Sequence, residues 1–244
     1  MNDSTRRVAL VTGGAGAFGT AIARKLTKDG WRVALGDIDD AKNKAAAEQV
    51  PDTMAVHLDV TDESSTLAAV QEIESTWGRL DGVVNNAGIL PVGDIAATDV
   101  QTFDRAMNIN LRGSFLVTKA ALSLVQQSES GRIVMIGSRT WLAGGNPAYT
   151  ATKAGLVGLA RSVALDLAAS RATCNVVAPG PVDTPLAPVG REAFQRWADQ
   201  TLLGRNATPE DVASTVAFFM SPESAFITGE VLHVAGGLQL AVKL

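Results

Sequence analysis

The sequence has few residues of several types that would point to particular structures. Cys174 is the only cysteine among 244 residues, so no disulfide can form within the chain. This usage is typical of a reducing compartment and predicts a cytoplasmic protein. The segment ATCNVVAP around Cys174 has the apolar character of a buried strand. That context favours inert packing over a reactive thiol.

Metal ligands, long apolar runs and excess positive charge are also missing. The two histidines, His57 and His233, stand in separate strand-like segments without other ligands at metal spacing, so we expect no metal site. No apolar run is long enough to cross a bilayer, and the one near the N-terminus is too short for a signal peptide. The net charge of −4 provides no basic surface for nucleic acid or anionic lipid. A small-molecule ligand is therefore expected, with no nucleic-acid or membrane partner.

Short apolar runs alternate with longer amphipathic segments along the whole chain. This alternation predicts an α/β fold with a parallel sheet covered by helices on both faces. We expect one domain over 1–244, a Rossmann-like, doubly wound sheet of about seven strands. The expected strands are Arg7–Thr12, Arg32–Asp37, Thr53–Asp59, Asp81–Asn85, Arg132–Ser138, Thr173–Ala178 and Val231–Ala235, and the expected helices are 17–30, 41–49, 63–77, 99–127, 149–169 and 209–220. The irregular stretch Pro179–Pro209, with one short helical piece, is expected to form a mobile loop over a site.

A glycine-rich loop follows the first expected strand. Gly14, Gly16 and Gly19 match the dinucleotide-binding pattern GxGxxG between a strand and a helix. Glycine allows the tight turn and the close approach of a pyrophosphate, and the helix N-terminus attracts the phosphate charge. A plain tight turn is the alternative, and we favour the phosphate loop because of its position.

The second expected strand ends at Asp37, about twenty residues after the loop. An acidic side chain there can bind the adenosine ribose hydroxyls and repel a 2′-phosphate. Ile38 and Asp39 follow, with no Lys or Arg beside them, so we predict NAD rather than NADP. The alternative for Asp37 is an N-cap of the next helix.

Several motifs occur in one order along nearly the whole chain, and together they resemble the short-chain dehydrogenase/reductase family, in its short single-domain form. They are Thr12–Gly19, Asp59-Val60, Asn85–Gly88, Asn110 in NINLRG, Ser138, Tyr149-x-x-x-Lys153, Pro179-Gly180 with Thr184, Thr228-Gly229 and Gly236-Gly237. The chain departs from the pattern at Ala17, where short members carry glycine, and Ala235 replaces a frequent Asp. The interval from Ser138 to Tyr149 is also shorter than is usual in the family.

Tyr149, the only tyrosine, stands four residues before Lys153 and shares a helix face with it. A tyrosine with a pKa of about 10 is a poor base near neutral pH, and a nearby cation lowers that pKa. The spacing alone also suits a packed Tyr beside a surface Lys. The other motifs favour general acid–base chemistry, with the lysine and a positive nicotinamide ring lowering the tyrosine pKa.

The resemblance implies the remaining roles. Tyr149 exchanges the proton of the substrate oxygen, Ser138 binds that oxygen, Lys153 also holds the nicotinamide ribose, and Asn110 holds a water. The residues that the resemblance places on the cofactor are Gly13, Gly14, Gly16, Ala17, Phe18, Gly19, Asp37, Ile38, Asp59, Val60, Asn86, Ala87, Gly88, Tyr149, Lys153, Pro179, Gly180, Val182 and Thr184. For Asp59, Val60 and Asn86, packing at a strand end explains the sequence equally well.

The substrate pocket is expected among Ile89–Val92, then Arg139, Trp141 and Leu142, and then Leu186–Trp197, which are mostly apolar. For Arg139 we favour an outward structural role over an anion ligand, and Trp141 fits a pocket wall or the core. The helix Tyr149–Ala169 is apolar or small on almost every face, which predicts a subunit interface, and the resemblance implies a homotetramer.

The sequence thus predicts an NAD-dependent oxidoreductase that interconverts a secondary alcohol and a ketone. A 3-oxoacyl thioester reductase and a catalytically idle NAD-binding protein are the alternatives. A nucleotide-sugar epimerase is more distant because the chain is too short for its substrate domain.

Overall fold

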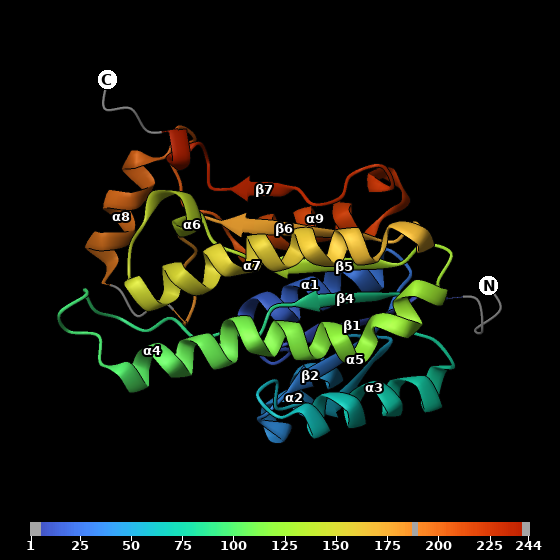
Figure 1. The fold of residues 1–244 in the computed structure, drawn as a ribbon. Helices are drawn as coiled ribbons and strands as arrows, with labels where there is room; N and C mark the ends of the chain where they lie inside the picture. The colour runs from blue at the N-terminus through green and yellow to red at the C-terminus, as the bar shows by residue number, and fades with distance from the viewer. Residues whose placement is uncertain (1–5, 187–189, 241–244) are drawn as a thin grey trace.

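The strands form a single parallel sheet, as the sequence predicted. The computed structural model describes residues 6–186 and 190–240. Seven strands pair in the order β3-β2-β1-β4-β5-β6-β7, and every pairing is parallel (Figure 1). Their bounds are β1 Val8–Thr12, β2 Arg32–Asp37, β3 Thr53–His57, β4 Gly82–Asn85, β5 Arg132–Ile136, β6 Thr173–Pro179 and β7 Val231–Val234. This is the doubly wound architecture, in which the order of strand addition reverses between β1 and β4.

Helices cover both faces of the sheet and enclose two apolar layers. One face carries α1 Ala17–Lys28, α2 Asp40–Glu48 and α9 Pro209–Met220, and the other carries α3 Glu63–Trp77, α5 Gly113–Gln127 and α7 Pro147–Asp166 (Figure 1). The central strands are buried on both sides, which explains their near-continuous Val, Ile and Leu content. The apolar runs of the sequence therefore reflect strands that are buried on both faces of the sheet.

The long helix expected over 99–127 is continuous but not uniform. It begins as α4 Val100–Ala106, passes through a π-helical turn at Met107–Arg112, and continues as α5. Asp99 caps its start by accepting the Thr102 backbone N–H. A π-helical turn inserts an extra residue per turn and is frequent at functional sites. Here it falls on the NINLRG motif.

The carboxyl edge of the sheet differs from the expectation in three places. Strand β5 ends at Ile136, so Ser138 lies beyond the strand and not at its end. A short helix that was not predicted, α6 Thr140–Ala143, occupies part of the interval from Ser138 to Tyr149. Helix α7 begins at Pro147, because proline suits the first turn of a helix, and not at Tyr149.

The predicted helical piece in the irregular stretch is confirmed as α8 Arg191–Gln200. Short 3₁₀ turns at Ala168–Ser170, Pro222–Ser224 and Leu238–Leu240 complete the secondary structure of the described residues. Over the same residues, no helix is both long and apolar enough to cross a membrane. The segments α4, α6 and α8 lie at the edge toward which the strands point (Figure 1), and the candidate site is located there.

Candidate active site

The glycine-rich loop is a closed turn packed against β2 and α1. Gly13 has a φ of +64°, which favours glycine, and the Gly16 N–H donates to the Gly13 carbonyl oxygen at 3.1 Å. A Cβ on Gly19 would lie 2.3 Å from that same oxygen, so any larger residue would separate the loop from the helix. The loop geometry therefore depends on glycine at these two positions.

Helix α1 starts at Ala17 directly after this turn. Its N-cap is Gly16, and no side chain caps it. Gly16 and Ala17 are exposed and Phe18 is half-buried, so the first turn is open to a ligand at the carboxyl edge. Ala17 is helical, and a helical position does not require glycine. This explains how the chain tolerates its departure from the family pattern.

Thr12, at the end of β1, connects the loop to the end of β4. Its Oγ1 accepts the backbone N–H groups of Asn86 and Ala87, both at 2.9 Å. In return, Asn86 Nδ2 donates to the Thr12 carbonyl oxygen at 2.8 Å and to the Gly13 carbonyl oxygen at 3.2 Å. Sequence reasoning placed Thr12 in the motif but assigned it no role. A polar residue at the end of a buried strand was the available signal.

Asp37 lies beside the glycine-rich loop and does not cap a helix. Its carboxylate accepts the N–H groups of Ala15 and Asp39, each at 3.1 Å. The N-cap of α2 is Asp39, whose side chain accepts the Lys42 N–H. The N-cap alternative for Asp37 is therefore wrong. Ile38 follows, with 62% of its surface exposed.

The residues after β3 form a packed turn. The Asp59 carboxylate accepts the Thr61 backbone N–H and hydroxyl, each at 2.8 Å. Val60 is buried in the core, and a Cβ on Gly113 would lie 2.8 Å from its Cγ2. Strand-end packing therefore accounts for the side chains of Asp59 and Val60, as it does in part for Asn86.

Ser138, in the turn after β5, lies at the carboxyl edge together with Tyr149 and Lys153 of α7. Tyr149 forms a side-chain hydrogen bond with Ser138. The Lys153 Nζ lies 5.3 Å from the centroid of the Tyr149 ring and donates to the Ile136 carbonyl oxygen at 2.7 Å. That carbonyl anchors a buried ammonium group against the phenol. Its part in holding Lys153 could not be read from the sequence.

Burial controls the charge states of this cluster. It raises the pKa of Tyr149 to about 12, against a smaller lowering by the Ser138 hydrogen bond. It also lowers the pKa of Lys153 to about 8. In the chain alone, then, the tyrosine pKa is above its usual value, and the expected lowering also involves the positive nicotinamide ring. Desolvation of the phenolate outweighs an ammonium group that is itself desolvated.

Asn110 lies in the π-helical turn before α5, and its side chain forms a hydrogen bond with α7. Its side chain is fully buried and forms two hydrogen bonds with the Ile89 backbone, at 2.8 and 2.9 Å. Its Nδ2 also reaches Thr152 Oγ1, at 3.2 Å, on the residue before Lys153. A Cβ on Gly88 would lie 3.1 Å from Asn110 Oδ1, so Gly88 allows this approach.

The turn after β6 lies beside the turn after β5, at the carboxyl edge of the sheet. The Gly180 N–H donates to the Val234 carbonyl oxygen at 2.9 Å, and a Cβ on Gly180 would come within 3.0 Å of Ala235. Val182 is buried and pairs with Ala207 in an isolated bridge, and Thr184 is half-buried. Part of the expected pocket segment Leu186–Trp197 lies outside the described residues.

Trp141 and His233 form a pair that sequence reasoning missed. Their rings stack with centroids 6.0 Å apart, and Trp141 Nε1 donates to His233 Nε2 at 3.1 Å. His57 instead pairs with Asp40. Within residues 6–186 and 190–240, no cluster of three His, Cys, Asp or Glu side chains could hold a metal ion.

Comparisons with known proteins place this geometry in a family. A family model described as enoyl-(acyl carrier protein) reductase matches residues 13–239. The BbsD subunit of (2S)-((R)-hydroxy(phenyl)methyl)succinyl-CoA dehydrogenase from Thauera aromatica is 35% identical, over 96% of this chain and 97% of its own. The chain belongs to the short-chain dehydrogenase/reductase family. As a member, it is an oxidoreductase that acts on a CH–OH group.

Two further short-chain dehydrogenase/reductases have similar sequence or structure. A 3-oxoacyl-(acyl-carrier-protein) reductase of Aquifex aeolicus is 36% identical, over 95% of this chain and 97% of its own. The crystal structure of a 3-ketoacyl-(acyl-carrier-protein) reductase from Brucella melitensis complexed with NADH superposes with a TM-score of 0.90 at 29% identity, covering 96% of this chain and 98% of that chain.

Replacing Thr12 with valine tests the connection between the loop and β4. Valine keeps the shape but leaves the Asn86 and Ala87 N–H groups without an acceptor, and an unsatisfied buried donor costs about 1–3 kcal/mol. We expect a comparable loss of stability in urea unfolding and weaker NADH binding. Thr12→Ser, which retains the hydroxyl, is the matched control. Equal stability of the Val and Ser variants would contradict the assigned role of Thr12.

Proposed function

We propose that this enzyme interconverts a secondary alcohol and a ketone with NAD(H). The observation that carries the proposal is the contact of Ser138, Tyr149 and Lys153 at the carboxyl edge of the sheet. At this edge the connections that follow β1 and β4 pass to opposite faces. In doubly wound sheets, ligands bind outside the carboxyl ends of the strands at this switch point. A proton-exchanging phenol beside a dinucleotide-binding loop suits hydride chemistry on a carbinol.

The residues around the loop fit a nicotinamide dinucleotide. The turn held by Gly13 and Gly19 and the uncapped first turn of α1 suit a pyrophosphate, and Asp37 suits ribose hydroxyls. When bound, the nicotinamide accepts or gives the hydride. The other proposed contacts are those of the sequence prediction: Gly14, Gly16, Ala17, Phe18, Ile38, Asp59, Val60, Asn86, Ala87, Gly88, Tyr149, Lys153, Pro179, Gly180, Val182 and Thr184.

The chain's own part in the reaction is proton transfer at the Tyr149 oxygen. In ketone reduction, the carbonyl carbon gains a hydride while the phenol gives its proton to the carbonyl oxygen, which leaves a phenolate. In alcohol oxidation, the phenolate takes the hydroxyl proton as the carbinol carbon loses a hydride. Ser138 donates to the reacting oxygen in both directions. Lys153 stabilises the phenolate, and Asn110 holds a water on the path that returns the proton to solvent.

The neutral phenol is strongly favoured in the chain alone, because its pKa is about 12. A group that must form a phenolate needs additional positive charge, and Lys153 alone does not lower the pKa enough. The free enzyme is therefore prepared to donate a proton to a ketone. Oxidation requires the positive charge of the oxidised cofactor.

Reduction of a 3-oxoacyl thioester is the second candidate. It is favoured by the matching reductases, of which the Aquifex enzyme covers 95% of this chain. The chemistry at Tyr149 would be identical, and the two functions differ in the body of the substrate. Preference for NADPH and turnover of acyl thioesters would favour this candidate.

Replacing Tyr149 with phenylalanine removes one oxygen atom and tests the reaction. General acid–base catalysis contributes about 10²–10⁴-fold, so we expect a loss of that size in kcat. The measurement is NADH absorbance with a panel of secondary alcohols, diols and ketones. NADH binding by fluorescence is the control and should be retained. A phenylalanine variant that keeps near wild-type turnover would overturn the assignment.

Cofactor choice provides a separate prediction from Asp37. A carboxylate at the ribose repels a 2′-phosphate, so NADH should bind at least about tenfold more tightly than NADPH, equivalent to about 1.4 kcal/mol. Asp37→Asn removes the charge but keeps the shape, and should reduce this ratio. Binding constants for both cofactors measure it. Tighter binding of NADPH by the wild type would refute the prediction.

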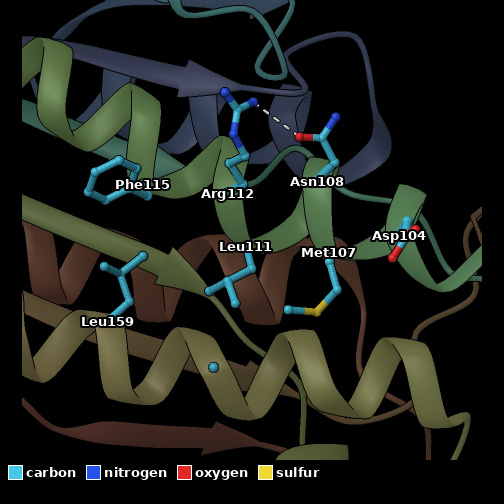
Figure 2. Close-up of a pocket in the computed structure, with 8 residues that line it drawn as sticks. Asp104, Met107, Asn108, Leu111, Arg112, Phe115 and Leu159 are labelled. Carbon is cyan, nitrogen blue, oxygen red and sulfur yellow. Dashed lines mark hydrogen bonds between the residues drawn. The ribbon is translucent and has the colours of Figure 1, made fainter.

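We also propose that the enzyme assembles through α5 and α7, as a homotetramer. An apolar groove of about 620 Å³ runs between these helices (Figure 2). Leu111, Met107 and Leu159 point into it, and Phe115 is 47% exposed at its rim. Gly155 also lines the groove, and its missing side chain makes room for Leu111 of the same chain, since a Cβ on Gly155 would lie 2.7 Å from Leu111 Cδ2.

The exposed face of α7 supports the same interface. Gly158 is exposed, with no atom within 4 Å of a Cβ placed on it, and Leu165 on this helix is 78% exposed. An apolar helix face of small residues allows a second helix to approach closely. A second copy of the chain would bury it together with the groove.

The variant Gly158→Arg tests this interface without disturbing the monomer, because the position is open. We expect light scattering at micromolar concentration to give a tetrameric mass for the wild type and a lower mass for the variant. Ala41→Arg on exposed α2 is the control and should keep the wild-type mass. A monomeric wild type, or an unchanged Gly158→Arg assembly, would contradict the proposal.

A further inference from the structure

Arg139 lies between two parts of the candidate site. It follows Ser138 directly, so the two Cα atoms are about 3.8 Å apart. Its backbone N–H donates to the Pro179 carbonyl oxygen at 2.9 Å, and its own carbonyl oxygen begins the first turn of α6. The side chain therefore originates between the residue that binds the reacting oxygen and the Pro179-Gly180 turn.

The Arg139 guanidinium is half-buried and has no partner among residues 6–186 and 190–240. No hydrogen bond or ion pair engages it, and no carboxylate stabilises its charge. Asp183, the acidic residue of the neighbouring turn, is exposed and does not contact it. Burial lowers the pKa of Arg139, although an arginine stays protonated near neutral pH. From the sequence we favoured an outward structural role, and the missing partner now supports the alternative of an anion ligand.

Two other buried or half-buried arginines in this chain are paired. Arg132 donates to the Gly131 and Ser221 carbonyl oxygens, and Arg7 donates to the Met220 carbonyl oxygen and lies over the Trp31 ring. These two stabilise the opposite edge of the sheet. Arg139 has no such partner among the described residues, so its guanidinium donors are free for a ligand that supplies the acceptors next to Ser138.

We propose that Arg139 binds a carboxylate on the substrate, so that the enzyme acts on short oxo and hydroxy acids. The planar guanidinium presents paired donors that match a carboxylate. Because Arg139 is adjacent to Ser138, the carboxylate belongs a few bonds from the reacting carbon, as in a 3-oxo or 4-oxo acid. This inference rests on the proposed function and specifies the substrate class for the same site.

The test compares acids with their neutral esters. Reduction of acetoacetate and 4-oxopentanoate, and of their methyl esters, is measured with NADH for the wild type, Arg139→Gln and Arg139→Lys. We expect the wild type to have a higher kcat/KM for the acids. In Arg139→Gln the ratio of acid to ester should fall about 10- to 100-fold, because a charge-assisted hydrogen bond is lost. Arg139→Lys should restore part of it.

A binding measurement keeps the test independent of turnover. Calorimetric titration of acetoacetate into the enzyme with NAD⁺ should show binding that weakens at least about tenfold in Arg139→Gln. Arg24→Gln, an equal change of charge on the exposed face of α1, is the control and should keep the wild-type affinity. An acetoacetate affinity equal in the wild type and Arg139→Gln, or no binding to either, overturns the carboxylate site.

The two proposals fail differently. If the esters are turned over and Tyr149→Phe abolishes this, but the acid-to-ester ratio is the same in the wild type and Arg139→Gln, the proposed function stands and the carboxylate site does not. If acetoacetate binding depends on Arg139 but no ketone is reduced, the anion site stands and the proposed function fails. NADH binding by every variant shows that the fold is intact.

Discussion

The candidate site depends on the two chain connections that leave the ends of β1 and β4 in different directions. These strands are neighbours, but the connections that leave them pass to opposite faces of the sheet, which is where doubly wound folds bind their ligands. The Thr12 hydroxyl joins the two ends by accepting the N–H groups of Asn86 and Ala87. Without this acceptor, two backbone donors would point into a gap between buried strands. The glycine-rich loop and the NNAG segment are therefore one structural unit.

Burial then determines the pKa values of Tyr149 and Lys153 at the same edge of the sheet. The same apolar packing that orders β5 and α7 raises the pKa of Tyr149 and lowers that of Lys153. Both pKa values depart from their ordinary values, and in the proposed reaction the phenolate depends on positive charge that arrives with the cofactor. This makes the cluster sensitive to the oxidation state of the cofactor, because the nicotinamide is positive in one state and neutral in the other. Proton transfer and hydride transfer are linked through electrostatics.

Much of the fold follows from the sequence, because two-sided burial leaves a direct pattern in it. The apolar runs located all seven strands, and the long helix over 99–127 was recovered as one element. The pattern could not show the π-helical turn around Asn110 or helix α6, since both are short and depend on tertiary contacts. Likewise, the Ile136 carbonyl that holds Lys153 is a backbone group, and only the folded chain brings it to the ammonium.

Arg139 shows why substrate class is harder to infer than reaction class. A proton-exchanging Tyr–Lys pair has a fixed spacing along a helix, so it is visible in the sequence. The partner of an arginine is set by the surroundings of its guanidinium, and here the described chain supplies no acceptor. Lys153, in contrast, is satisfied by the Ile136 carbonyl. Of these two cationic side chains, only Lys153 has a hydrogen-bond acceptor within the described chain. The proposed carboxylate substrate would supply the acceptor that Arg139 lacks.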